Sequence, residues 1–231
     1  MPTPVSDAVI LAQNLSRIYT MGETRVIGIT GIDLEITAGE LIVLKGNSGS
    51  GKSTLLSLMA GLDRATTGTF TVSGVDLGNA DRTALTRFRR EVVGMVFQAF
   101  NLLPTLSVVE NICLPALLAG GERRNIHQRA VELLDWLDLK RRLRHFPAQL
   151  SGGEMQRTAI ARALINNPSV ILADEPTGNL DSRNGQIVME LLAELNRRWN
   201  RTVIIATHSI LADPFATRTI CLKDGNINDR R

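Results

Sequence analysis

The sequence predicts an α/β protein with a mainly parallel sheet at its centre. Residues 170–173 and 203–206 are continuous apolar runs, which is typical of strands that are buried on both faces. A helical segment from about residue 184 to 199 separates them, in the order of a parallel strand-helix-strand crossover. A third apolar run, residues 41–45, leads through a glycine-rich loop into the helical spacing of residues 52–59.

The composition favours one domain without a membrane span. The 231 residues are 44% hydrophobic, enough to bury one sizeable core, so residues 1–231 are expected to form a single domain. No apolar stretch approaches the roughly 20 residues of a membrane helix, and the N-terminus lacks the pattern of a secretory signal. Cys113 and Cys221 lie far apart without metal-ligand spacing, which fits the cytoplasm. The net charge of +3 is small, and the basic residues 140–144 lack interleaved aromatics, so no nucleic-acid partner is expected.

The first part of the chain is expected to add an antiparallel subdomain. Short β-branched runs predict strands at residues 8–15, 32–36 and 69–72. Between the early strands stand the turn signals Gly22, Gly31 and Gly39-Glu40.

The middle of the chain is expected to be helical. After a strand-like run at residues 93–97, residues 99–165 read almost entirely as helices and loops. We expect them to form a helical subdomain inserted in the catalytic core.

A phosphate-binding loop follows the strand at residues 41–45. Gly46, Gly51, Lys52 and Ser53 match G-x-x-x-x-G-K-[ST], in which backbone amides and a helix N-terminus surround phosphates. Lys52 is expected to reach the β- and γ-phosphates, and Ser53 to ligate Mg²⁺. The expected cofactor-binding residues here are Gly46, Asn47, Ser48, Gly49, Ser50, Gly51, Lys52, Ser53 and Thr54. The motif predicts a P-loop NTPase fold with a RecA-like core.

Two carboxylates end the strand at residues 170–173. Parallel α/β sheets bind ligands at the carboxyl ends of their strands. Asp174 is therefore expected to hold Mg²⁺, and Glu175 to orient or deprotonate the attacking water. Taken alone, the pair also fits a helix cap or a turn.

A second anion-binding segment lies at residues 150–154, Leu-Ser-Gly-Gly-Glu, ahead of a helical run at residues 155–164. With this segment the chain resembles, over nearly its whole length, the nucleotide-binding subunit of an ATP-binding cassette (ABC) transporter. The resemblance implies ATP and Mg²⁺ as cofactors and a homodimer with ATP at its interface. In that dimer Ser151, Gly152, Gly153 and Glu154 would complete the pocket of a second copy.

The resemblance also implies roles for single residues outside these motifs. Gln98 matches a glutamine that contacts Mg²⁺ and the attacking water, and His208 matches a histidine on the γ-phosphate. Asp181 matches a loop that crosses the dimer, although it also fits a helix cap. Tyr19 matches an aromatic residue that stacks on adenine, although it also fits a packing role. Ser209 stands where many relatives carry an aspartate.

Short stretches, among them residues 19–22, 61–64 and 101–106, resemble the lipoprotein-releasing and macrolide-exporting ATPases. That subgroup implies an integral membrane permease subunit, a periplasmic adaptor protein and a place at the cytoplasmic face of the inner membrane. Residues 100–115 would receive a helix of the permease, with Leu102, Leu103 and Leu106 as an apolar groove. The alternatives are a cell-division-type cassette and the ATPase of an ordinary ABC permease. A binding module without turnover is disfavoured by Glu175.

Overall fold

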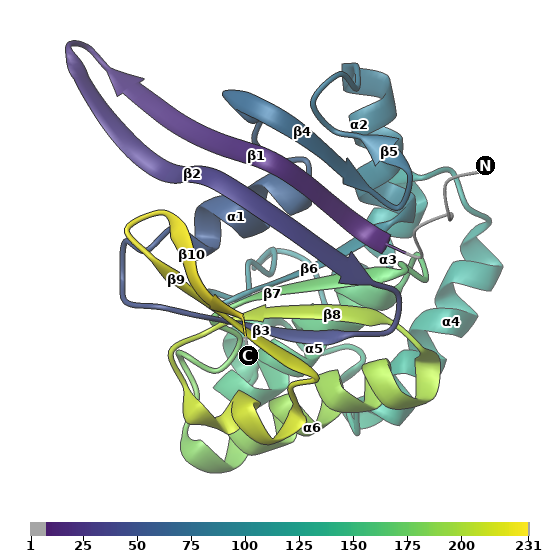
Figure 1. The fold of residues 1–231 in the computed structure, drawn as a ribbon. Coiled ribbons are helices and arrows are strands. Elements are labelled where there is room, and N and C mark those ends of the chain that lie inside the picture. The colour runs from purple at the N-terminus through teal and green to yellow at the C-terminus, as the bar shows by residue number, and fades with distance from the viewer. Residues whose placement is uncertain (1–7, 231) are drawn as a thin grey trace.

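The computed structural model describes residues 8–230 (Figure 1). Its central sheet has six strands in the order β10-β9-β3-β8-β7-β6. From β9 to β6 neighbouring strands are parallel, whereas β10 runs antiparallel to β9. The strands are β3 (Leu41–Lys45), β6 (Val93–Phe97), β7 (Val170–Asp174), β8 (Thr202–Ala206), β9 (Arg218–Lys223) and β10 (Asn226–Arg230). The predicted α/β class is confirmed, while β9 and β10 were not predicted.

A second, four-stranded sheet of order β2-β1-β4-β5 is antiparallel. It consists of β1 (Ala8–Met21), β2 (Thr24–Thr37), β4 (Thr67–Val72) and β5 (Val75–Asp76). The predicted ends of the first two strands were wrong, because β1 and β2 form one long hairpin that projects from the molecule (Figure 1). Residues 24–27 of β2 are exposed, so this part of the hairpin lacks the buried alternation by which a strand is recognised.

Gly31 was predicted to mark a turn, and this prediction was wrong. It lies inside β2 with φ of 57°. The pairing of β1 with β2 shifts register nearby, and the Gly31 amide donates to Ser16 Oγ at 2.9 Å. A glycine with positive φ inside a strand marks an irregularity of the ladder as readily as a turn.

Helices cover both faces of the central sheet. Their bounds are α1 (Lys52–Met59), α2 (Arg82–Glu91), α3 (Val108–Leu118), α4 (Arg123–Trp136), α5 (Gly152–Leu164) and α6 (Ser182–Trp199). Short 3₁₀ helices are η1 (Lys140–Arg142), η2 (Pro147–Gln149) and η3 (Ile210–Phe215). Helix α6 begins ahead of the predicted residue 184 because the Asp181 side chain accepts from the Asn184 amide at 2.9 Å and caps it.

Alternate residues of the central strands enter two core clusters. Leu41 and Val43 of β3 pack in a cluster with residues of α3 to α6. Ile42 and Leu44 pack on the opposite face with α1, α2 and the antiparallel sheet. Because successive side chains of a strand point to opposite faces, the sheet is buried on both sides. This double burial explains why the strands are continuously apolar.

The predicted helical segment, residues 99–165, contains α3, α4 and α5 and no strand. Its helices share a core cluster with β7 and α6. The division of the chain at residues 99 and 165 stays a prediction. Among the described residues, no helix combines the length and the apolar character that crossing a membrane requires.

Candidate active site

The phosphate-binding loop leaves the carboxyl end of β3 and enters α1, in the predicted strand-loop-helix order. Gly46 and Gly51 have φ of 154° and 102°. A Cβ atom on Gly46 would collide with the Leu222 carbonyl oxygen, and one on Gly51 would lie 2.5 Å from the Gly28 carbonyl oxygen. Both positions therefore require glycine, for backbone conformation and for close packing.

Lys52 begins α1 and folds back over the loop. Its Nζ donates to the carbonyl oxygens of Gly46 at 2.7 Å and Asn47 at 3.1 Å. The side chain of Ser50 is buried, and its Oγ has no hydrogen-bond partner. The Lys52 ammonium group therefore contacts backbone carbonyl oxygens, and the Ser50 hydroxyl is unpaired beside a helix N-terminus. Both features are typical of a loop that binds an anion.

Ser53 and Asp174 meet although they lie far apart in the sequence. Ser53 Oγ donates to Asp174 Oδ1 at 3.1 Å. Burial raises the pKa of Asp174, and the charge of Glu175 raises it further, against the opposing effects of Ser53 and Lys52. No group of three His, Cys, Asp or Glu side chains gathers as a metal site among the described residues. One hydroxyl and one carboxylate, completed by phosphate oxygens, are nevertheless a donor set that suits Mg²⁺.

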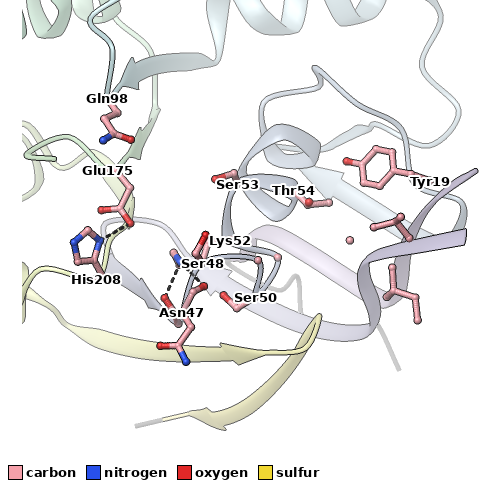
Figure 2. A pocket seen from close by; sticks show the side chains of 16 residues that line it. Tyr19, Asn47, Ser48, Ser50, Lys52, Ser53, Thr54, Gln98, Glu175 and His208 are labelled. Carbon is pink, nitrogen blue, oxygen red and sulfur yellow. Dashed lines mark hydrogen bonds and ion pairs between the residues drawn. The ribbon is translucent and has the colours of Figure 1, made fainter. Parts of the chain in front are cut away.

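Glu175 follows β7 with φ of 44°, a sparsely populated conformation for a non-glycine residue. Its Oε1 lies 3.0 Å from His208 Nδ1, and its Oε2 accepts from Thr207 Oγ1 at 3.0 Å. Both carboxylate oxygens are therefore held, and Figure 2 shows Glu175 and His208 facing each other beside the loop. A carboxylate held in this way could orient a water molecule or accept its proton.

Two supporting residues were missed by the sequence analysis. Thr207 is fully buried, and its hydroxyl also accepts from the Ser209 amide at 3.0 Å. Lys45 Nζ lies 2.6 Å from Asp213 Oδ1 and donates to the Ser209 carbonyl oxygen at 2.6 Å, which anchors the loop of His208 to β3. Their only signal was adjacency to the motifs. Ser209 caps η3 by accepting from the Leu211 amide at 3.2 Å.

Gln98 follows β6 and is held loosely to the loop after Glu175. Its backbone carbonyl oxygen accepts from Asn179 Nδ2 at 3.0 Å, and its side-chain Nε2 donates to Asn179 Oδ1 at 3.5 Å. The next turn contains Phe100 and Asn101 with positive φ, and Arg162 of α5 donates to both of their carbonyl oxygens. Arg162, which was not predicted, thus ties α5 to the segment that carries Gln98.

An open cavity of about 780 Å³ connects most of the predicted residues. Apart from Val26, Ile27 and Gly28, its lining consists of predicted residues: Tyr19, Gly46, Asn47, Ser48, Gly49, Ser50, Gly51, Lys52, Ser53, Thr54, Gln98, Glu175 and His208 (Figure 2). Asp174 reaches the edge of this set through Ser53. The predicted residues Ser151, Gly152, Gly153, Glu154 and Asp181 do not line it.

The segment at residues 151–154 begins α5 with a capping box. The Ser151 amide donates to Glu154 Oε2 at 2.8 Å, and Arg142 Nε donates to Glu154 Oε1 at 2.7 Å. These contacts, the Ser151 amide first, lower the pKa of Glu154 despite its partial burial. The Glu154 carboxylate is therefore occupied within its own chain. At Gly153 a Cβ atom would lie 2.6 Å from Asn184 Cγ, so a larger residue would displace the Asn184 side chain.

Asp181 caps α6, as the alternative interpretation of this residue predicts. Its carboxylate accepts from the backbone and side chain of Asn184, and these hydrogen bonds lower its pKa. A role of Asp181 or Glu154 at a nucleotide stays a prediction.

The fold and this site define a class of protein. A glycine-rich loop and a buried lysine at the end of β3, with Asp174 and Glu175 at the end of β7, form the site of a P-loop nucleoside triphosphatase. Within that class, the chain belongs to the ABC transporter family, whose model matches residues 29–178.

Individual relatives agree with this assignment. The chain is 44% identical to the uncharacterized ABC transporter ATP-binding protein MJ0796 of Methanocaldococcus jannaschii, over 94% of each chain. It is 48% identical to the macrolide export ATP-binding/permease protein MacB of Shigella flexneri over 93% of its own length, but it spans only 33% of that relative. A solved dimeric structure of MJ0796 with ADP and Pi superposes with a TM-score of 0.89, at 40% identity, covering 96% of this chain and 97% of the other.

These findings confirm the predicted family and the α/β fold. The chain is an ATP-binding cassette and an ATP-hydrolysing subunit of the transporter type, similar to the macrolide-exporter subgroup.

Proposed function

We propose that the chain is a Mg²⁺-dependent ATPase that acts as a homodimer and powers a membrane-embedded exporter or mechanotransmission complex. The observation that carries the proposal is the separation of the two anion sites in one copy. The loop at residues 46–53 lines the cavity, whereas residues 151–154 do not. Residues 151–154 of a second copy would therefore complete the cavity.

The residues of the cavity divide the chemistry among them. Lys52 and the amides of the phosphate-binding loop bind the β- and γ-phosphates of ATP. Ser53, Asp174 and Gln98 would hold Mg²⁺, which would supply charge neutralisation of the phosphate oxygens. Glu175 orients the attacking water and accepts its proton, and His208 contacts the γ-phosphate beside it. Phosphoryl transfer needs mainly this alignment and charge stabilisation.

Dimerisation completes the site around ATP. Ser151, Gly152 and Gly153 at the N-terminus of α5 contact the γ-phosphate from the second copy. Asp181 lies beside them on the same interface. Support comes from the similarity to MJ0796, whose solved cassette is dimeric and holds ADP and Pi. ATP therefore joins the two copies, and hydrolysis releases them.

Removal of the metal tests the proposed ATPase activity. We expect phosphate release by the purified chain to fall to background with excess EDTA and to return with added Mg²⁺, because the metal neutralises the transferred phosphoryl group. EDTA that is already saturated with Mg²⁺ is the control and should have no effect. Continued hydrolysis in EDTA would exclude the proposed metal dependence.

The membrane partner is proposed from the similarity to MacB, a macrolide export ATP-binding/permease protein. The chain corresponds to about a third of that relative, whose name covers both an ATP-binding part and a permease. The partners that we propose for the cassette are an integral membrane permease with large periplasmic domains and a periplasmic adaptor protein. The chain then lies at the cytoplasmic face of the inner membrane. This similarity favours an exporter over an ordinary permease or a cell-division cassette.

The docking surface is proposed at the segment between β6 and α3. Leu103 is 44% exposed there, next to the less exposed Leu102 and Leu106. The neighbouring hollow is lined by Arg89, Arg90 and Arg162, together with Pro115 of α3. An amphipathic helix of the permease would cover the apolar side chains.

Leu103→Asp tests this surface. We expect the variant to copurify about tenfold less with the membrane protein that accompanies the wild type, because a carboxylate would be buried at the contact. Gln128→Glu, a charge on the exposed face of α4, is the matched control. ATP binding should be unchanged in both. Full copurification of the Leu103 variant would place the interface elsewhere.

A further inference from the structure

Tyr19 lies at the end of the cavity away from Glu175 and His208 (Figure 2). It is the only tyrosine of the chain. Val26 and Ile27 of the facing strand line the same end, and they are 46% and 56% exposed. A flat aromatic ring beside exposed apolar side chains suits a purine base, which is itself flat and largely apolar on its faces.

The ring of Tyr19 is held from one side by Arg17. Both residues lie on β1, two positions apart, so their side chains share a face of the strand. The guanidinium carbon of Arg17 is 4.4 Å from the ring centroid, a cation-π contact. Because Arg17 covers one face of the ring, a ligand in the cavity would stack on the opposite face.

Asp63 holds both residues at once. Its Oδ2 accepts from the Tyr19 hydroxyl at 2.8 Å and from Arg17 Nε at 2.8 Å. Its Oδ1 lies 2.8 Å from Arg17 Nη2, which makes the ion pair bidentate, and accepts from the Arg64 amide at 2.7 Å. Partial burial raises the pKa of Asp63, but the hydrogen bonds from Arg64, Tyr19 and Arg17 outweigh it and lower the pKa.

The cluster connects the base end of the cavity to the phosphate end. Asp63 follows α1, the helix that begins at Lys52. On the facing strand, a Cβ atom at Gly28 would lie 2.8 Å from Tyr19 Cε2 and 2.9 Å from Thr54 Cγ2. Gly28 therefore lets the ring edge pack against the backbone next to Thr54. The ring is fixed by its hydroxyl, one face and one edge.

We propose that Arg17 and Asp63 are positioning residues that orient the Tyr19 ring for stacking on the base of the bound nucleotide. They act through Tyr19, because neither Arg17 nor Asp63 lines the cavity itself. Because the ring is already immobilised, stacking on it costs little conformational entropy. The inference rests on the proposed binding of ATP in this cavity.

The test compares a ligand that has a base with one that lacks it. ATP and inorganic tripolyphosphate are titrated by calorimetry into the wild type and into Arg17→Ala, Asp63→Asn and Tyr19→Ala. We expect Tyr19→Ala to weaken ATP binding about tenfold, and the other two variants to weaken it about fivefold or more. Tripolyphosphate affinity should stay within about twofold in all of them, because the phosphate-binding loop is unchanged.

Two further variants separate positioning from folding. Arg17→Lys keeps the charge but loses the bidentate pair, and should recover part of the ATP affinity. Arg25→Ala removes an exposed arginine from the same hairpin and should bind both ligands like the wild type. In the double variant Arg17→Ala/Tyr19→Ala, ATP affinity should equal that of Tyr19→Ala alone, since Arg17 acts through the ring.

Ring-labelled tyrosine gives an independent measurement, because Tyr19 produces the single tyrosine signal. ATP should shift this signal in the wild type and shift it less in Arg17→Ala. If Tyr19→Ala weakens ATP binding and Arg17→Ala and Asp63→Asn do not, the positioning role is wrong. Equal weakening of ATP and tripolyphosphate binding would also overturn it. If Tyr19→Ala has no effect, the placement of the base fails instead.

Discussion

Glu175→Gln is expected to reduce ATP hydrolysis by about 10²- to 10⁴-fold, the range for loss of a general base. The two side chains have the same shape, so the contacts of Glu175 with Thr207 and His208 can persist. The amide cannot accept the proton of the attacking water. Lys52, Ser53 and the loop are unaffected, so ATP should bind with wild-type affinity and remain uncleaved.

The measurement pairs phosphate release with size-exclusion chromatography and light scattering in Mg²⁺ and ATP. If ATP joins two copies and hydrolysis separates them, Glu175→Gln should elute as a stable dimer where the wild type does not. Glu190→Gln, on the exposed side of α6, is the matched control and should behave as the wild type. Turnover at the wild-type rate would remove Glu175 from the proposed mechanism.

Lys52→Ala is expected to weaken ATP binding by about 10- to 100-fold, the equivalent of roughly 1.5 to 3 kcal/mol for hydrogen bonds to a charged group. Lys52 is nearly buried, at 8% exposure, and its ammonium group contacts the carbonyl oxygens of Gly46 and Asn47 in the loop where the phosphates would bind. Its removal deletes the main positive charge of the phosphate end.

Calorimetry with ATP and with tripolyphosphate should show the loss for both ligands. This pattern differs from that of the Arg17 variants, which should affect only the ligand with a base. Lys223→Ala removes an exposed lysine at the end of β9 and serves as the control. The melting temperature should show that the Lys52 variant is folded. Unchanged affinity would contradict the assignment of Lys52 to the phosphates.

Motifs that combine a strand end with a short loop were predictable from the sequence. The segment from Gly46 to Ser53 leads from β3 into the first turn of α1 as expected, Asp174 is the last residue of β7, and Glu175 follows it. Such sites are predictable because one local stretch supplies both the backbone conformation and the reacting groups. The hairpin of β1 and β2 was harder to predict from the sequence. Its exposed half has no buried alternating face, and Gly31 resembles a turn signal although it lies inside β2.

Partners brought together from distant strands were not predictable. Thr207 supports Glu175 because β7 and β8 are neighbours in the sheet, and neither residue indicates the other in the sequence. Asp63 holds Tyr19 and Arg17 because the loop after α1 passes the hairpin. Arg162 of α5 donates to the carbonyl oxygens of Phe100 and Asn101, which lie 62 and 61 residues earlier in the sequence.

The sequence by itself determined the fold class and the family and supplied the candidate reacting groups, because periodicity and short motifs encode them locally. Only the tertiary structure decided which hydrogen-bond and ion-pair partner each of these side chains has. It showed that the Glu154 carboxylate is occupied by Arg142 and Ser151 and that Asp181 caps α6. It also placed the start of α5 outside the cavity. The physical reason is that side-chain contacts depend on strand order and on loop packing. Both are determined jointly by many residues that lie far apart in the sequence.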